Sequence, residues 1–135
     1  MKKGPLRVFA DDHIRKTTIK MNEKQCMEFS KSMALLGKSL SQLKKKITIN
    51  EDIPLLEIKA GTYDIQRFLY WNFLKCWWSP NVPFDQSVAT NYDWYYPKFA
   101  YRHSEKEIRK WFKDIKLKIV YFNEIESGFS INGKK

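Results

Sequence analysis

The chain has 135 residues and a mass of 16.2 kDa, which is enough for one domain with a modest hydrophobic core. Hydrophobic residues make up 43% and aromatic residues 16% of the sequence, which argues against intrinsic disorder. Basic residues outnumber acidic ones by 25 to 15, but no basic run is longer than Lys44–Lys46, which favours a compositional bias over a specific polyanion site.

Two helices are predicted near the start of the chain. Pro5 suits a first helical turn, and one apolar face continues to about Arg15, formed by Leu6, Phe9, Ala10 and Ile14. Asn22 and Gln25 have the spacing of a capping box, and apolar residues then recur every three or four positions to about Lys45. Gly37 within this second helix costs roughly 1 kcal/mol relative to alanine, which indicates a close packing contact or a break.

The middle of the chain combines an irregular stretch with its most apolar segment. Residues 47–62 are predicted to be irregular, with a short extended piece at Ile47–Ile49. Tyr63–Trp78 is apolar on nearly every face, so we expect a helix that is buried on most sides. The prolines of the stretch 79–83 end this helix, and residues 84–103 are expected to form an aromatic loop.

The chain ends in a predicted helix and β-hairpin. Ser104 and Glu107 form a second capping-box signature, and the buried face that follows consists of Ile108, Trp111, Phe112 and Ile115. Lys118–Asn123 is predicted to be a strand, residues 126–128 a turn, and Phe129–Asn132 the returning strand. The predicted fold class is therefore α+β, with a helical region followed by a C-terminal helix and a β-hairpin.

The cysteines and the hydropathy bound the cellular compartment. Cys26 and Cys76 share no motif and favour buried thiols in a reducing cytosol over a disulfide scaffold. The N-terminus has no signal-peptide pattern, and no stretch approaches 18 apolar residues. We therefore expect a cytoplasmic protein with no transmembrane segment.

The C-terminal third carries a family resemblance. It contains in order Asp93-Trp94-Tyr95, Pro97, His103-Ser104, Glu107, Trp111-Phe112 and a closing Gly128-x-Ser130-x-x-Gly133-Lys134. This order resembles the C-terminal end of class I S-adenosylmethionine-dependent methyltransferases of the type 11 group. Residues 4–15 and 51–68 resemble, respectively, the stretch after the fifth sheet strand and a helical insertion found in a subset of that family.

The resemblance implies the C-terminal part of an α/β Rossmann-like fold that lacks its first five strands. Residues 1–19 would follow the missing fifth strand, residues 20–90 would form a helical insertion that covers the substrate, and residues 91–135 would supply the aromatic loop, last helix and terminal hairpin. The terminal strand would then have an open edge, so we expect the chain to need a partner that carries the cofactor-binding half, or to self-associate.

The cofactor of the family is S-adenosylmethionine, which it binds through a glycine-rich turn after the first strand. The five glycines of this chain include no pair spaced as Gly-x-Gly. The resemblance therefore assigns no cofactor-binding residue here, and the chain alone is expected neither to bind the cofactor nor to be active.

Eight residues are weak candidates for the chemistry. Methyl transfer needs an aligned acceptor and sometimes a base, and the resemblance places four possible bases in the substrate-side loop: His103, Tyr95, Tyr96 and Asp93. Candidate substrate contacts are Arg67, Tyr70, Trp71 and Trp94. For each, a structural role is the stronger interpretation: His103 ordering the start of the last helix, Asp93 as a turn acceptor, Arg67 in a surface ion pair, and the aromatic residues as packing.

A metal site is not predicted. Asp11, Asp12 and His13 are adjacent on a helix and do not face one point, so a solvated helix face is the favoured interpretation.

Three functions remain open at this stage. The leading hypothesis is the substrate-lid part of a methyltransferase that acts on a small-molecule or lipid-like acceptor when a cofactor-binding half is supplied. The first alternative is a non-enzymatic basic and aromatic module that binds nucleic acid or an anionic surface, although no specific nucleic-acid binding is expected. The second alternative is an interaction subunit of a split methyltransferase.

Overall fold

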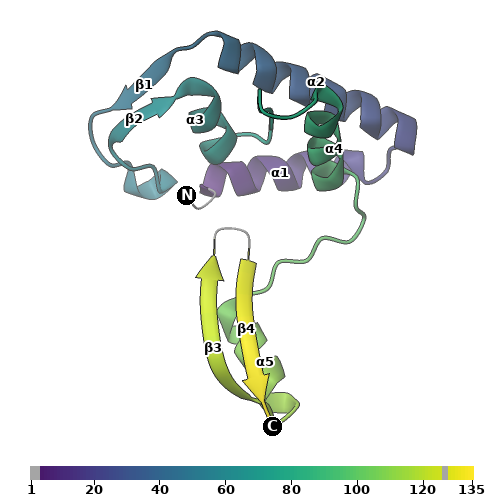
Figure 1. The fold of residues 1–135 in the computed structure, drawn as a ribbon, viewed down its shortest axis with the longest axis vertical. Helices are drawn as coiled ribbons and strands as arrows, with labels where there is room; N and C mark the ends of the chain where they lie inside the picture. The colour runs from purple at the N-terminus through teal and green to yellow at the C-terminus, as the bar shows by residue number, and fades with distance from the viewer. Residues whose placement is uncertain (1–3, 126–127) are drawn as a thin grey trace. The chain divides into compact units, whose positions relative to one another are not determined.

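The computed structural model describes residues 4–125 and 128–135, and the chain divides into two compact units at Lys98/Phe99. The first unit is mainly helical and the second consists of one helix and a β-hairpin (Figure 1). The α+β class predicted from the sequence is therefore confirmed. Along the described residues, no helix is long and apolar enough to cross a membrane.

The first unit contains four α-helices and a small hairpin. The helices are α1 (Pro5–Thr18), α2 (Glu23–Gln42), α3 (Ile65–Asn72) and α4 (Phe84–Tyr95). The hairpin pairs β1 (Lys46–Ile49) with β2 (Gly61–Asp64) in antiparallel register, and a 3₁₀ turn η1 (Pro54–Leu56) lies between them. The extended piece predicted at 47–49 is confirmed, whereas its partner β2 was not predicted.

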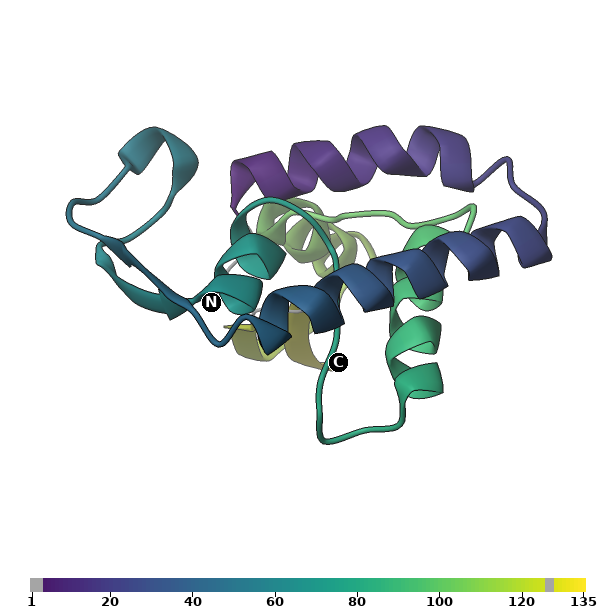
Figure 2. The same cartoon turned by 90° about the horizontal axis from the view of Figure 1, so that it is seen from above.

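Helix α2 is the longest element of this unit and packs against α4 and α3, while α1 packs against α3 and α4 (Figure 2). Its predicted capping box is present: Asn22 accepts from the Gln25 amide at 2.9 Å, and the Gln25 side chain accepts from the Asn22 amide at 3.0 Å. The core cluster lies between α2, α4 and the segment before α4, and is made of Cys26, Met33, Cys76 and Tyr95. Both cysteines are free and buried, as predicted.

Helix α1 is fixed to the end of α4 by its polar side chains. Arg15 donates to the carbonyls of Trp94 and Pro97, each at 2.6 Å, and Thr18 donates to the carbonyl of Tyr95 at 2.7 Å. The last carbonyls of a helix lack partners within the helix, so these bonds satisfy the C-terminus of α4 from outside.

The long apolar helix predicted over Tyr63–Trp78 is wrong at both ends. Residues 63–64 belong to β2, α3 covers only Ile65–Asn72, and residues 73–83 form neither helix nor strand. Side chains from the neighbouring helices replace the helical hydrogen bonds of this segment: Tyr95 Oη donates to Lys75 O at 3.0 Å, and Gln66 Nε2 donates to Cys76 O at 3.1 Å. These tertiary bonds outweigh local helix preference.

Two further partners of this segment come from α4 and α2. The buried Asn91 side chain accepts from the Trp77 amide at 3.0 Å and donates to the Trp77 carbonyl at 2.9 Å. A Cβ on Gly37 would lie 2.3 Å from the carbonyl oxygen of Cys76. Gly37 thus marks a close packing contact and not a helix break.

The aromatic loop predicted over 84–103 is also wrong for its first part, because Phe84–Tyr95 is helix α4. Pro83 stands immediately before the helix and Asp85 lies in its first turn, both of which favour a helix start. The inward face has helical spacing and contains Ser87, Val88, Asn91 and Tyr95. The loop itself is confined to residues 96–104.

The second unit matches the prediction for the end of the chain. Helix α5 (Glu105–Asp114) has the capping box between Ser104 and Glu107. Strands β3 (Lys118–Ile125) and β4 (Gly128–Lys134) pair in antiparallel register, with a bulge at Val120. Of the turn predicted over residues 126–128, residues 126 and 127 fall outside the described residues, and Gly128 begins β4.

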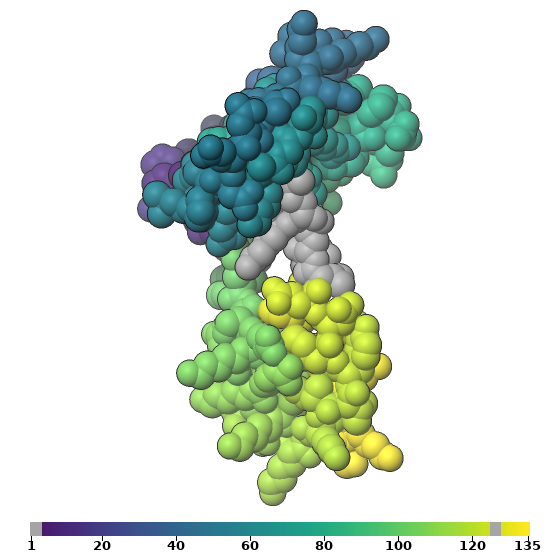
Figure 3. Space-filling model, turned by 90° about the vertical axis from the view of Figure 1, so that its left-hand side faces the viewer, coloured from purple at the N-terminus to yellow at the C-terminus, as the bar shows by residue number. Residues whose placement is uncertain are grey.

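Helix α5 lies against one face of the hairpin (Figure 3). Arg109 lies over the ring of Phe122, with 4.2 Å from guanidinium carbon to ring centroid, and Phe122 packs against Phe129 across the strands at 5.4 Å. A Cβ on Gly133 would meet the ring of Phe112 at 2.6 Å, so glycine permits the close approach of α5 to β4.

Candidate functional site: a buried cation–aromatic cluster

Helix α1 buries a polar face, contrary to the sequence-based interpretation. On the predicted apolar face, Leu6 is 37% and Phe9 71% exposed, and Ile14 is half-buried against the core. Arg7 and Asp11 are at 0%. The prediction that Asp11 belongs to a solvated helix face is therefore wrong. A charged pair at positions where the hydrophobic pattern predicts none is a typical sign of a functional or strained site.

Five side chains from four segments meet around this pair, and we name them the cation–aromatic cluster. They are Arg7 and Asp11 of α1, Tyr70 of α3, Lys75 of the segment 73–83, and Trp94 of α4. Tyr70 and Trp94 were substrate-contact candidates from the sequence, and the structure brings them together through Arg7 and Lys75. The other three members were not candidates.

The Arg7–Asp11 pair is anchored on one side only. Arg7 Nε donates to Asp11 Oδ2 at 2.7 Å, Arg7 Nη1 donates to the carbonyl oxygen of Tyr70, and Trp94 Nε1 donates to the same Asp11 Oδ2 at 3.0 Å. Within the described residues, Arg7 Nη2 and Asp11 Oδ1 are buried without a hydrogen-bond partner. Leaving a buried donor or acceptor unmatched costs about 1–3 kcal/mol, more for a charged group, so this arrangement needs an explanation.

Two cations lie over the same two aromatic rings. The Arg7 guanidinium carbon is 4.7 Å from the ring centroid of Tyr70 and 5.8 Å from that of Trp94. Lys75 Nζ is 5.7 Å from Tyr70 and 4.9 Å from Trp94, and Lys75 is only 6% exposed. Cations this close to an aromatic face are attracted to it, which lowers the cost of burying them.

Tyr95, a possible base from the sequence, is unsuited to that role. It is fully buried, its hydroxyl already donates to Lys75 O, and burial raises the pKa of its phenol far above the ordinary value, with the Asp11 carboxylate adding to the rise. A phenol whose pKa is raised this far stays protonated, so no phenolate forms that could act as the base. Tyr95 is a core residue that fixes the segment carrying Lys75.

Asp93 and Tyr96 lie near the end of α4, outside the cluster contacts. Asp93 is exposed on the helix and does not lie in a turn as the sequence suggested. Tyr96 stacks on Tyr92, with ring centroids 4.6 Å apart and planes at 19°. Burial, followed by the neighbouring Tyr96, raises the pKa of Tyr92 to about 12. This pair is packing by its geometry.

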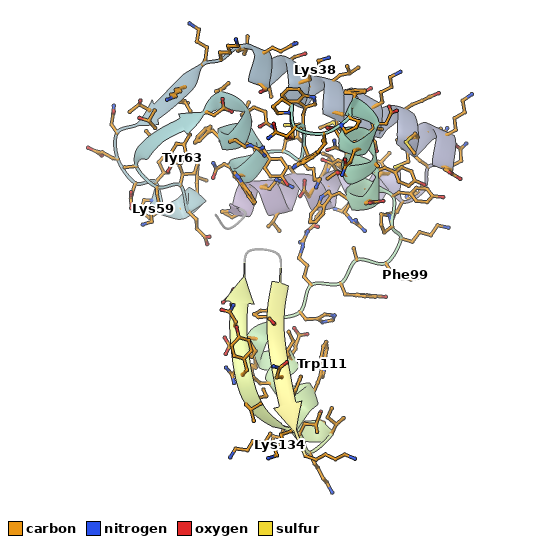
Figure 4. All side chains as sticks on the ribbon, viewed as in Figure 1. Lys38, Lys59, Tyr63, Phe99, Trp111 and Lys134 are labelled. Atoms are coloured by element: carbon orange, nitrogen blue, oxygen red, sulfur yellow. The ribbon has the colours of Figure 1, made fainter. Side chains whose placement is uncertain are left out.

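His103 belongs to the second unit and is exposed there. Its ring packs edge-on against Trp111 at 4.6 Å, and Phe99, Tyr101, His103 and Trp111 form a row of rings that we name the aromatic row. Phe99 and Tyr101 are 76% and 74% exposed. Figure 4 shows Phe99 on the segment before α5 and Trp111 on α5 itself.

The remaining substrate candidates are peripheral. Arg67 is exposed, and its backbone amide donates to Asp64 Oδ1 at 3.1 Å, so that Asp64 caps α3. Trp71 is half-buried and packs edge-on against Tyr70, with ring centroids 4.9 Å apart, so it touches the cluster through that ring alone among the contacts described. Among the residues searched, no group of His, Cys, Asp and Glu side chains could hold a metal ion.

The sequence held one signal for Arg7 and none for Lys75. Arg7 and Asp11 are four residues apart on a predicted helix, which is the spacing of an ion pair, and Thr18 continues the same face. Lys75 reaches the cluster only because residues 73–83 are not helical. Its position therefore depends on contacts that are distant in the sequence.

Comparison with known proteins adds no identification. No protein-family model matches the chain. No curated protein and no solved structure matches it either. The interpretation below therefore depends on the residues and their geometry.

Proposed function

We propose that this chain forms the substrate-side lid and the C-terminal helix and hairpin of an S-adenosylmethionine-dependent methyltransferase, and that it acts together with a cofactor-binding half. The observation that carries the proposal is the ordered motif of the C-terminal third, from Asp93-Trp94-Tyr95 to Gly133-Lys134. The capped helix α5 and the antiparallel pair β3–β4 have the element order that the resemblance implies.

The second unit supports a role inside a larger sheet. Among the described residues, β3 and β4 form a two-stranded sheet, and a hairpin of this size depends on packing such as that against α5. Large apolar side chains remain exposed around it: Trp111 at 46%, Ile115 at 64%, Val120 at 59% and Tyr121 at 49%. Such surface is typical of an interface with further protein.

The chemistry divides between the two halves. S-adenosylmethionine supplies an electrophilic methyl group when it is bound. The residues present here do not fit a site for it, because no Gly-x-Gly turn occurs among them, so its contacts are assigned to the other half. The part of this chain is to hold and orient the methyl acceptor and to take up its proton. His103 is the candidate proton acceptor, since it is exposed and imidazole is the commonest general base.

The test is reconstitution. The chain is mixed with a separately expressed five-stranded cofactor-binding half, taken from a methyltransferase whose own C-terminal segment has the same motif. Calorimetry should detect no S-adenosylmethionine binding by this chain alone and one molecule bound per reconstituted pair. Micromolar one-to-one binding by the chain alone, or a mixture that neither associates nor binds the cofactor better than the separate half, would contradict the proposal. The same experiment tests the alternative that this chain is an interaction subunit of a split methyltransferase. That alternative differs from the proposal only in that the two halves are separate chains in nature.

A basic and aromatic binding module is the second candidate, and the exposed aromatic row is the observation that favours it. Aromatic rings beside lysines bind single-stranded nucleic acid by stacking. Fluorescence anisotropy with single- and double-stranded oligonucleotides at about 150 mM salt separates the two proposals. We expect weak, sequence-independent binding, whereas submicromolar and sequence-dependent binding would place this candidate first.

A further inference from the structure

We propose that the cation–aromatic cluster is an oxyanion-binding site that takes a carboxylate or phosphate group. We further assign this group to the methyl acceptor, and that second assignment alone rests on the proposed function. The inference starts from the half-satisfied ion pair and the convergence of two cations on the same rings.

The free guanidinium nitrogen is the first argument. A guanidinium carries five N–H donors in a planar fork, a shape that matches carboxylate and phosphate oxygens. Two of its nitrogens are already used inside the protein, by Asp11 Oδ2 and by the carbonyl of Tyr70. Nη2 has no such partner among the described residues although Arg7 is fully buried. An oxyanion at Nη2 would convert an unmatched donor into a charge-assisted hydrogen bond.

The second argument is the charge around that nitrogen. Lys75 Nζ and the Arg7 guanidinium lie over the same two rings, so both positive charges are directed into one small region. Arg7 is fully buried and Lys75 is 6% exposed, and such burial strengthens the attraction between these cations and an anion. The negative charge of Asp11 is offset by Arg7 Nε and Trp94 Nε1, both of which donate to Oδ2.

Asp11 narrows the class of ligand. Its second oxygen, Oδ1, is a buried acceptor without a partner, beside the guanidinium that carries the free donor. A ligand that presents an oxyanion oxygen to Nη2 and a hydroxyl group to Oδ1 satisfies both. Hydrogen phosphate has both groups, and so does a hydroxy acid. A bare carboxylate satisfies only Nη2, so we expect it to bind more weakly.

Access to the cluster requires one wall to open. Lys75 comes from residues 73–83, which form neither helix nor strand, whereas the other members lie on helices α1, α3 and α4. Residues 75–77 of this segment are held by side chains of Tyr95, Gln66 and Asn91 and not by a helical ladder. Ligand entry on the side of this segment therefore requires these side-chain hydrogen bonds to open.

The alternative occupant is a water molecule that bridges Nη2 and Oδ1. A bridging water would satisfy both atoms without any anion specificity. The experiment must therefore compare anions of different shape at the same ionic strength.

The test is an NMR titration of the whole 135-residue chain. The indole N–H of Trp94 donates directly to Asp11 and so reports on the cluster, and its signal is assigned as the one missing from Trp94→Phe. Inorganic phosphate, lactate as a hydroxy acid, acetate and chloride are titrated separately at matched ionic strength. We expect a saturable shift with phosphate and lactate, a weaker one with acetate and none with chloride.

Paired lysine variants test the role of the cluster. Lys75→Met keeps the aliphatic stem and removes the charge, and we expect it to weaken phosphate binding at least about tenfold. Lys59→Met removes an equal charge from the β1–β2 hairpin, where the side chain is 79% exposed, and should leave binding unchanged (Figure 4). Circular dichroism spectra confirm that both variants are folded.

Three results would overturn the inference: identical shifts with all four anions, no saturable shift in the wild-type chain, or equal loss of affinity in both lysine variants. The wild-type titration suffices even if a variant does not fold. The anion titration contains no cofactor, so its result does not depend on the reconstitution. Anion binding together with a failed reconstitution would refute the methyltransferase proposal and leave the anion site standing. The opposite pair of results would refute the site alone.

Discussion

Replacing Gly37 by alanine sets two physical effects against each other. Gly37 lies within helix α2, where alanine is favoured by about 1 kcal/mol on intrinsic propensity. The new methyl group would lie 2.3 Å from the carbonyl oxygen of Cys76 and 3.1 Å from its carbonyl carbon. Both are backbone atoms, which cannot rotate away as the end of a side chain can.

The magnitude follows from what has to move. Ordinary contact distance is about 3.5 Å, so the carbonyl of Cys76 must shift by about 1 Å. We take the upper end of the range for overpacking, about 3 kcal/mol, because the obstacle is backbone. The same carbonyl accepts from buried Gln66 at 3.1 Å, and the loss of that bond adds about 1 kcal/mol. Offsetting these costs by the helix gain leaves a net destabilisation of about 3 kcal/mol.

The assay is urea denaturation followed by far-ultraviolet circular dichroism, which reports mainly on the helical unit of residues 4–98. The urea midpoint of Gly37→Ala should fall, and its melting temperature should drop by roughly 12 °C or more. Ser39→Ala, two residues along on the exposed side of α2, is the matched control and should gain a few tenths of a kcal/mol. If Gly37→Ala is as stable as the wild type or more so, then the close contact between α2 and the segment 73–83 is absent and the reasoning fails.

Three further predictions concern the buried charges, a thiol and a helix cap. Arg7→Met should lower the free energy of unfolding by about 3–5 kcal/mol, because it leaves Asp11 buried without its cation. Adding Asp11→Leu should recover most of that loss in a double-mutant cycle, and equal, additive losses would contradict this. Burial raises the pKa of Cys76 from 9.0 to about 11, so the native state keeps a proton that the unfolded chain loses. Stability from this group is therefore complete below pH 9.0 and lost as pH rises toward about 11, and Cys76→Ala should flatten the fall of the urea midpoint in that window. Ser104→Ala removes the cap of α5 and should lower the stability of the second unit by about 1 kcal/mol. Hydrogen exchange of the α5 amides measures this loss, and Ser130→Ala, on the exposed side of β4, is the control.

The elements that the sequence predicted correctly are those with strong local signals. The capping boxes at Asn22 and Ser104 use side chains to satisfy the first amides of a helix, and both signals depend on residues three apart. The C-terminal hairpin was predicted from its short β-rich runs on either side of a turn signal. These features need no information from distant parts of the chain.

Local pattern was misleading where tertiary hydrogen bonds decide the backbone. An apolar run such as Tyr63–Trp78 fits a buried helix and a buried extended segment equally well by periodicity. Asn91 and Gln66 select a non-helical form for its second half, because their side chains bond the backbone of residues 76 and 77. Helix α4 was missed for the opposite reason, since its aromatic residues were assigned to a family loop although Val88, Asn91 and Tyr95 have helical spacing.

The sequence by itself determined the α+β class, the capped helices, the C-terminal hairpin and the buried free cysteines. Only the tertiary structure decided that helix α1 turns its charged side inward, and that Lys75 joins Arg7 on the rings of Tyr70 and Trp94. The physical reason is the range of the interactions. Caps and turns are made between neighbours in the chain, whereas the burial of a charge depends on partners contributed by residues more than 60 positions away, as in the bond from Arg7 to the carbonyl of Tyr70.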